Sequence, residues 1–354
     1  MKPFAISLGT LYEAKNILVQ IFTSDGLVGW GEGSPFPFIV GETQATALAL
    51  GKDFAQLWMG KDALAIAERM QELHGYVPFN TTVKSAFDMA LYDIAAQQAG
   101  QPLYRFLGGE KKVLLTDETI SVGTPEGMAE IAQQLKAQGA PFIKVKLGKG
   151  NDAQGDIERV KAIRQAIGHT IPLRLDANQG WTVANAISVL NALVDDNVQF
   201  CEQPVLGYDY AALKQVHDAA AIPVMADEAC FNNFQAQQLI AQQACRYLNI
   251  KMSKSSGILE ATAIAQTAAA AGMDCMLGGM IESKLALTAN AHFACAHHNI
   301  VFYDLDYCFP HTLDPVEGGV SFTNRYQINL PDVPGIGARV EAGFLSKCEK
   351  VVIG

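Results

Sequence analysis

Two patterns of hydrophobic and polar residues divide the chain. From about residue 115 onward, short apolar runs alternate with Ala-rich stretches of helical periodicity. Repeated strand–helix units indicate a parallel sheet, and eight strands at this spacing favour a closed (β/α) barrel over an open doubly wound sheet. The eight candidate strands are TDETIS, FIKVKLG, IPLRLDAN, VQFCEQP, IPVMADE, YLNIKMS, MDCMLGG and NIVFYDLD.

The segment before the barrel has a different pattern. Residues 16–32 predict two strands joined by a turn at Asp25 and Gly26, and three helical stretches follow at roughly 43–58, 61–74 and 80–99. The tail contains VSFTNRYQINL and is expected to return to this first part. We therefore predict an α+β domain over residues 1–110, a barrel over 111–314, and a C-terminal segment over 315–354 that packs on the first domain.

Composition narrows the range of partners. The 354 residues are 49% hydrophobic and carry a net charge of -10 without a Lys/Arg stripe, which argues against nucleic acid and anionic membranes as partners. No apolar run is long enough to span a membrane, and the first residues lack the apolar core of a signal peptide. Seven cysteines without a C-x-x-C pair favour reduced thiols and a cytoplasmic location.

Charged residues close four successive strands of the predicted barrel. Asp176, Glu202, Asp227 and Lys251 follow one another at intervals of 26, 25 and 24 residues, which is one strand–helix unit each. Equal positions on barrel strands meet at the C-terminal mouth, where three carboxylates need a cation to stay ionised. An oxygen-only set suits Mg²⁺ first and Mn²⁺ second. The alternative is that each acid caps a helix or faces solvent.

Two lysines share one face of the predicted second strand. Lys144 and Lys146 are two residues apart in FIKVKLG, and strand residues at this spacing point the same way. Across a barrel they would face Lys251, so a bound substrate would have an amine on each side. We expect Lys144 and a metal ion to lower the pKa of Lys146 and make it a base. The alternative is a pair of surface lysines on an edge strand.

Together these motifs resemble the enolase superfamily, specifically its muconate-lactonizing-enzyme subgroup. The resemblance implies a modified TIM barrel, (β/α)₇β, with an α+β capping domain. It also implies one Mg²⁺ on Asp176, Glu202 and Asp227, acid/base catalysis by Lys146 and Lys251, and proton abstraction next to a carboxylate through a metal-stabilised enediolate. The motifs are KVK at 144–146, LDAN at 175–178, CEQP at 201–204, ADE at 226–228, NIKMSKSSG at 249–257 and GGMIES at 278–283.

Within the subgroup the chain is most similar to the dipeptide epimerases. Their D-x-D motif, which binds the substrate's N-terminal ammonium, corresponds to Asp304 and Asp306 in YDLDY. The resemblance further implies a small-molecule dipeptide substrate, epimerisation at the C-terminal residue and a homo-oligomer. It places Thr119, Lys144, Asn178, Met280 and Ile281 against the substrate, with Glu228 and Glu282 behind the site.

Three other activities would use the same strand-end residues. An o-succinylbenzoate synthase or a muconate-type cycloisomerase would use the same lysines and metal but has no ammonium to bind. A catalytically idle barrel would keep only ligand binding. Acid-sugar dehydratases are disfavoured because the seventh strand region, MDCMLGGMIES, lacks a histidine base.

Two departures from the family concern the N-terminal part. The chain starts close to the end of the family's first strand, which predicts a truncated start or a capping sheet with one strand fewer. Gly9 stands where epimerases of glutamate-terminated dipeptides tend to have an arginine. With Phe36, Phe38 and Ile39 in the next loop, this predicts a preference for uncharged C-terminal residues.

Overall fold

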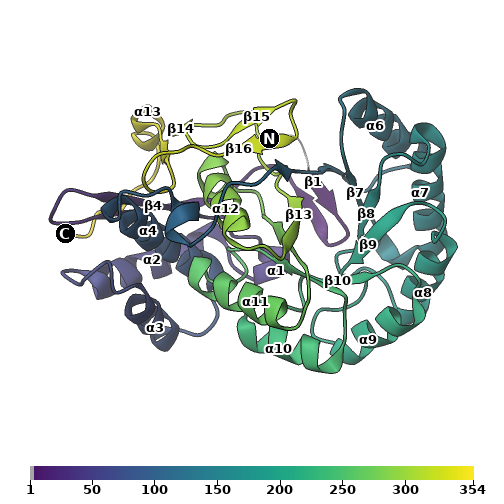
Figure 1. Cartoon of the computed structure of the whole chain (residues 1–354), viewed down its shortest axis with the longest axis horizontal. Helices are drawn as coiled ribbons and strands as arrows, with labels where there is room; N and C mark the ends of the chain where they lie inside the picture. The colour runs from purple at the N-terminus through teal and green to yellow at the C-terminus, as the bar shows by residue number, and fades with distance from the viewer. Residues whose placement is uncertain (1–3) are drawn as a thin grey trace.

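A barrel of eight parallel strands dominates the computed structural model, which describes residues 4–354 (Figure 1). The strands are hydrogen-bonded in chain order, and the N–H of Asp117, just before the first, donates to the carbonyl of Tyr303 in the last at 3.3 Å. The barrel strands are β6 (Glu118–Ile120), β7 (Ile143–Lys146), β8 (Leu173–Asp176), β9 (Val198–Glu202), β10 (Val224–Ala226), β11 (Tyr247–Ile250), β12 (Cys275–Gly278) and β13 (Ile300–Asp304).

Seven helices connect these strands and cover the barrel, so the predicted (β/α)₇β fold is confirmed. Six of the seven begin after a Ser, Thr, Asp or Asn whose side chain accepts a backbone N–H of the first turn, which stabilises the helix start. The helices are α6 (Pro125–Ala137), α7 (Ala153–Ile167), α8 (Val183–Ala192), α9 (Tyr210–Ala219), α10 (Asn233–Gln242), α11 (Ile258–Ala270) and α12 (Lys284–Ala296).

The N-terminal part consists of two hairpins and five helices. Both strands predicted within 16–32 are present, and so are the three helices, although the second begins at Ile66 rather than 61. Asp62 explains the later start, because its side chain accepts the N–H of Leu64 and holds the chain in a turn. The elements are β1 (Phe4–Ile6), β2 (Gly9–Leu11), β3 (Ile17–Phe22), β4 (Val28–Gly33), α1 (Pro37–Val40), α2 (Gln44–Trp58), α3 (Ile66–Tyr76), α4 (Thr81–Gln98) and α5 (Leu103–Phe106).

Helix α4 lies directly on strand β4, and glycine makes this close approach possible. Gly29, Gly31 and Gly33 alternate along β4 and share the face that meets the helix. A Cβ atom on Gly31 would overlap the carbonyl oxygen of Ala86 in α4. The sequence GWGEG therefore fixes the distance between the hairpin and the helix.

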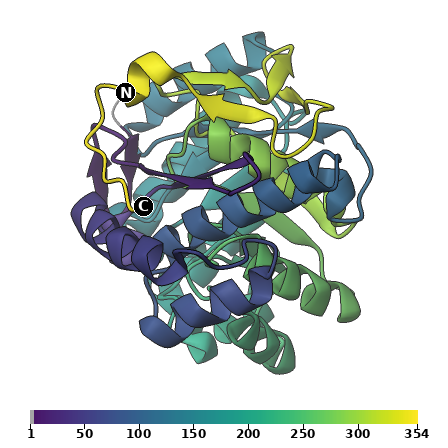
Figure 2. The same ribbon diagram turned by 90° about the vertical axis from the view of Figure 1, so that its left-hand side faces the viewer.

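The C-terminal segment connects the two parts of the molecule. Its N–H and carbonyl groups at Gly335 pair with Gln101 and Leu103 beside α5. Figure 2 shows this yellow segment running across one side of the molecule near the purple N-terminal strands. Its elements are β14 (Val316–Gly318), β15 (Ser321–Thr323), β16 (Gln327–Asn329), β17 (Ala338–Val340) and α13 (Ala342–Leu345), and β16 also pairs with β5 (Leu114–Leu115).

One buried histidine joins three of these elements. The Nδ1 atom of His292 in α12 accepts the N–H of Tyr104 in α5 at 3.1 Å, and Nε2 lies 3.0 Å from the carbonyl of Ile336 in the tail. These two contacts define a neutral ring with its proton on Nε2. Burial lowers the pKa of His292 to about 4.

Among the helices of residues 4–354, none has the length and apolar content that crossing a membrane requires.

Candidate active site

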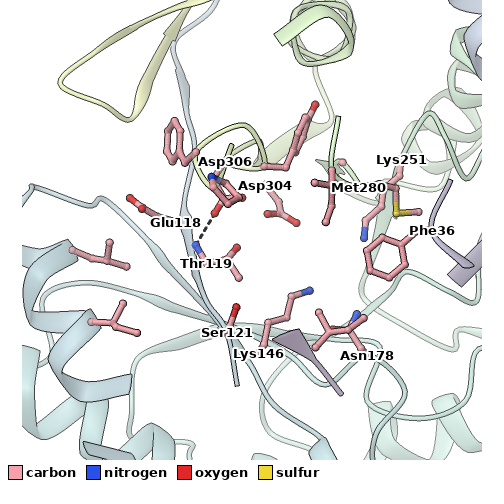
Figure 3. Close-up of a pocket in the computed structure, with 18 of the residues that line it drawn as sticks. Phe36, Glu118, Thr119, Ser121, Lys146, Asn178, Lys251, Met280, Asp304 and Asp306 are labelled. Atoms are coloured by element: carbon pink, nitrogen blue, oxygen red, sulfur yellow. Dashed lines mark hydrogen bonds between the residues drawn. The ribbon is translucent and has the colours of Figure 1, made fainter. Parts of the chain in front are cut away.

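A cavity of about 410 Å³ lies at the C-terminal ends of the barrel strands, beneath the N-terminal part (Figure 3). The barrel contributes Lys146, Lys251 and Asp304 to its lining, and the N-terminal part contributes Ile6 and Phe36. Figure 3 shows the two lysine side chains pointing into the same space from different strands. The cavity is in the size range of small-ligand sites.

The strand-end residues come from neighbouring strands of the barrel, as their spacing predicted. Lys146, Asp176 and Glu202 are direct neighbours across strands β7, β8 and β9. Asp227 and Lys251 each follow the last residue of their own strand. The three carboxylates are fully buried beneath the cavity, with Lys146 Nζ 2.6 Å from Asp176 and Lys251 Nζ 2.7 Å from Asp227.

Lys144 lies below the cavity lining, among the carboxylates. Its ammonium is 2.6 Å from Asp304, 2.7 Å from Glu202 and 3.1 Å from Asp176. Burial alone would lower the pKa of Lys144, but the three carboxylates outweigh it and hold the pKa well above its usual value. For Lys251 too, Asp227 and Glu202 outweigh burial and raise the pKa. The expectation from the sequence concerned Lys146, and it stays a prediction.

The three strand-end acids have the chemistry of a divalent cation site. Burial and the neighbouring Asp176 raise the pKa of Glu202 to about 8, although Lys144 is adjacent. Lysine contacts outweigh burial for Asp176 and Asp227 and lower both pKa values. The three acids offer only oxygen ligands, which suit a hard cation.

A second acidic cluster borders the same cavity. Within residues 4–354, one group of three acidic side chains has oxygens all within 4.8 Å of one another, and it consists of Asp117, Asp304 and Asp306. Arg174 donates to Asp117 at 2.8 Å, and the N–H of Thr119 donates to Asp306 at 2.7 Å, as the dashed line in Figure 3 shows. Burial, Asp304 and Asp117 raise the pKa of Asp306 well above its usual value. Arg174 and Lys144 supply positive charge to Asp117 and Asp304, and Asp304 and Asp306 reach the cavity.

Apolar side chains form the end of the cavity near Lys251. Ile6, Phe36, Met280 and Ile281 make one buried cluster between the N-terminal part and the loop after β12. Glu282 accepts the N–H of Met280 at 2.6 Å and so fixes this loop. The predicted placement of Met280 and Ile281 at the cavity and of Glu282 behind it agrees with this geometry.

Of the remaining predicted site residues, two line the cavity and one lies behind it. Thr119 and Asn178 line the cavity. Glu228 lies behind Asn178 and accepts a hydrogen bond from its side-chain amide at 3.2 Å. Its other carboxylate oxygen has no hydrogen-bond partner within residues 4–354.

Two loop residues are placed differently from what the sequence suggested. Phe36 and Ile39 line the cavity, but Phe38 does not and is 47% exposed. Gly9 is not part of the lining either, because it faces the ring of Phe38. Alternate loop residues point in different directions, and the sequence did not show which of the two phenylalanines turns inward.

The sequence did not indicate the opposite end of the cavity. Glu118 and Arg325 form an ion pair there, beside Phe309 and the helix α6. Glu118 precedes Thr119 on β6, so its strand position was a usable signal. No signal pointed to Arg325, which comes from the C-terminal segment.

A (β/α)₇β barrel with an N-terminal cap, strand-end acids and lysines on two sides of one cavity defines the enolase class of enzymes. Two family models match the chain: "Mandelate racemase / muconate lactonizing enzyme, N-terminal domain" over residues 1–108 and "Enolase C-terminal domain-like" over 127–343. The chain belongs to the mandelate racemase/muconate lactonizing enzyme family of the enolase superfamily.

Curated relatives and solved structures agree with this membership. The D-Ala-D/L-Ala epimerase of Cytophaga hutchinsonii is 44% identical over 99% of this chain and 95% of its own length. The L-Ala-D/L-Glu epimerase of Bacillus subtilis is 38% identical over 95% and 92%. The Cytophaga hutchinsonii dipeptide epimerase, solved with Mg and the dipeptide D-Ala-L-Val, superposes with a TM-score of 0.97 over 99% of this chain and 95% of that one, at 44% identity. The predicted resemblance to dipeptide epimerases and the assignment to the isomerases are confirmed.

Proposed function

We propose that this protein is a Mg²⁺-dependent dipeptide epimerase, which inverts the alpha carbon of the C-terminal residue by a 1,1-proton transfer. The observation that carries the proposal is the opposed pair Lys146 and Lys251, which point into one cavity that also contains Asp304 and Asp306. The relatives named as dipeptide epimerases support it.

Asp176, Glu202 and Asp227 would hold the metal ion. They are preferred over the Asp117 cluster because they lie directly against both lysines that border the reacting carbon. When bound, Mg²⁺ would draw electron density from the substrate's terminal carboxylate, which acidifies the adjacent C–H bond.

The lysines carry the proton transfer. One lysine removes the alpha proton on its side, which gives the enediolate of the substrate, and the other returns a proton to the opposite side. Buried groups with fixed neighbours hold their atoms in place for such a step. Lys251 is 4% exposed and Lys146 is 6% exposed, so both side chains are held closely by their surroundings.

Asp304 and Asp306 would bind the N-terminal ammonium of the dipeptide. A positive charge here relieves the repulsion that raises the pKa of Asp306. This feature favours an epimerase of dipeptides over an o-succinylbenzoate synthase or a cycloisomerase, since those substrates carry no ammonium. Neither alternative substrate would bring a positive charge to these two carboxylates.

The side chain of the C-terminal residue would occupy the apolar cluster at Phe36 and Met280. Matching one apolar side chain to such a pocket gains about 1–3 kcal/mol. A glutamate there would lose water without gaining a cation, which is costly. We therefore expect higher kcat/KM for Ala-Ala, Ala-Leu and Ala-Phe than for Ala-Glu.

Stereospecific deuterium exchange tests the two-lysine scheme. Lys146→Ala and Lys251→Ala should each abolish epimerisation of a dipeptide in D₂O, while each variant still exchanges the alpha proton of one epimer through its remaining lysine. Circular dichroism checks that the variants fold. Near-normal epimerisation by either variant contradicts the scheme.

Metal titration separates the two acidic clusters. Asp304→Asn should lose activity on dipeptides yet bind Mn²⁺ as tightly as the wild type, as measured by electron paramagnetic resonance. Glu202→Gln should lose the Mn²⁺ site. The reverse pattern would mean that the metal lies on the Asp117 cluster.

A further inference from the structure

The tail contributes a charged residue to the cavity through a tight turn. Asn324 and Arg325 join β15 to β16, and both have positive φ angles, 49° and 67°. A left-handed backbone is uncommon for residues other than glycine and is retained where the surrounding structure requires it. This turn directs Arg325 away from its own hairpin and toward β6 of the barrel.

Arg325 and Glu118 form a geometrically complete ion pair. The guanidinium donates from Nε to Oε2 at 2.8 Å and from its terminal nitrogen to Oε1 at 2.5 Å. Tyr326 donates its hydroxyl to the same carboxylate at 3.0 Å, and the ring of Phe309 lies 4.4 Å from the guanidinium carbon. A two-point pair of this kind is oriented as well as charged.

This pair lies at the end of the cavity remote from the lysines. In Figure 3, Thr119 and Asp306 lie between Glu118 on one side and Lys146, Lys251 and Phe36 on the other. The cavity continues past Glu118 to Gln134 in α6 and to Gln138, which directly follows this helix. A ligand anchored at Asp306 can therefore extend in two opposite directions.

We propose that the Glu118–Arg325 pair selects the side chain of the substrate's N-terminal residue. The inference rests on the proposed function: with the ammonium at Asp304 and Asp306 and the reacting carbon between the lysines, the N-terminal side chain extends toward the pair. Because each charge already has its partner, an acidic or basic side chain must displace one member to be paired. The wild-type enzyme is therefore selective for uncharged N-terminal side chains.

Breaking the pair from either side tests this assignment. In Arg325→Met, Glu118 is left unpaired, so kcat/KM for Lys-Ala relative to Ala-Ala should rise at least tenfold. In Glu118→Gln, Arg325 loses its counter-charge, so kcat/KM for Glu-Ala relative to Ala-Ala should rise by a similar factor. Because the two variants should favour N-terminal side chains of opposite charge, the results distinguish readout of charge from a general loosening of the site.

Arg339→Met is the matched control. Arg339 pairs with Glu317 at 2.7 Å on the same C-terminal segment but does not line the cavity, so its removal should leave the ratios unchanged. Unchanged N-terminal preference in both test variants, with dipeptide epimerisation intact, overturns this inference alone. A wild-type protein that epimerises no dipeptide overturns the proposed function.

Discussion

Substitution at Gly9 would install selectivity for a C-terminal glutamate. A side chain at this position points at Phe38, with its Cβ 2.7 Å from the ring, and Phe38 packs edge-on against Phe36 at 6.1 Å between ring centres. Phe36 lines the cavity. An arginine at position 9 can therefore reach the pocket only along the space that Phe38 occupies, so the variant to make is Gly9→Arg combined with Phe38→Ala.

The expected gain follows from the charge on the new side chain. A hydrogen bond that involves a charged group contributes about 1.5–3 kcal/mol, and each 1.4 kcal/mol is about a factor of ten. The ratio of kcat/KM for Ala-Glu to that for Ala-Leu should therefore rise about 10- to 150-fold. Because Phe38 is 47% exposed, removing its ring should destabilise the fold less than the about 3–5 kcal/mol typical of a buried phenylalanine.

A competition assay measures this ratio directly, with both dipeptides in one reaction followed by chiral chromatography. Phe38→Ala alone is the control, because it opens the space without adding a charge and should leave the ratio near that of the wild type. Ala-Gln separates charge from size, because glutamine is about as large as glutamate but uncharged. Its kcat/KM relative to that of Ala-Leu should rise little in the double variant. An unchanged ratio in the double variant, or an equal rise in Phe38→Ala, would refute the placement of the C-terminal side chain beside Phe36.

Three further predictions concern stability and the metal ion. Gly31→Ala should destabilise the protein by at least about 3 kcal/mol, because its Cβ would overlap the backbone of α4, whereas Gly75→Ala, in α3 with open space around it, should stabilise by about 0.5–1 kcal/mol; thermal melts that rank the two variants equally contradict this. Burial lowers the pKa of His292 to about 4 from the ordinary 6.5, so below about pH 6.5 the unfolded chain binds a proton that the folded chain excludes. The free energy of unfolding should then fall by about 3 kcal/mol between about pH 6.5 and 4, and His292→Gln should lose that part of the pH dependence in denaturant titrations. Removal of divalent ions with EDTA should abolish epimerisation and added Mg²⁺ should restore it; activity that survives EDTA would argue against the metal site.

The local pattern of apolar and polar residues was sufficient to predict the barrel, because strands and helices differ in the period and composition of their residues. The interval between Asp176 and Glu202 equals one strand–helix unit, and in a parallel barrel this spacing alone makes them neighbours. Sequence is informative here because the fold repeats, so position along the chain converts directly into position in space.

Long-range contacts explain what the pattern missed. The raised pKa of Lys144 depends on Asp304, which is 160 residues away, so its direction could not follow from the neighbouring lysine. Arg325 pairs with Glu118 across 207 residues. Its role depends on where the tail crosses the barrel, and no periodicity encodes that path.

The position of Arg325 late in the chain has a consequence for synthesis. A chain emerges from the ribosome N-terminus first, so the barrel lysines and Glu118 are available before the hairpin that carries Arg325. Until that hairpin docks, the carboxylate of Glu118 faces the cavity without its counter-charge. A segment made after the barrel thus supplies the outer wall, and a barrel without it would discriminate among peptides less well than the folded enzyme.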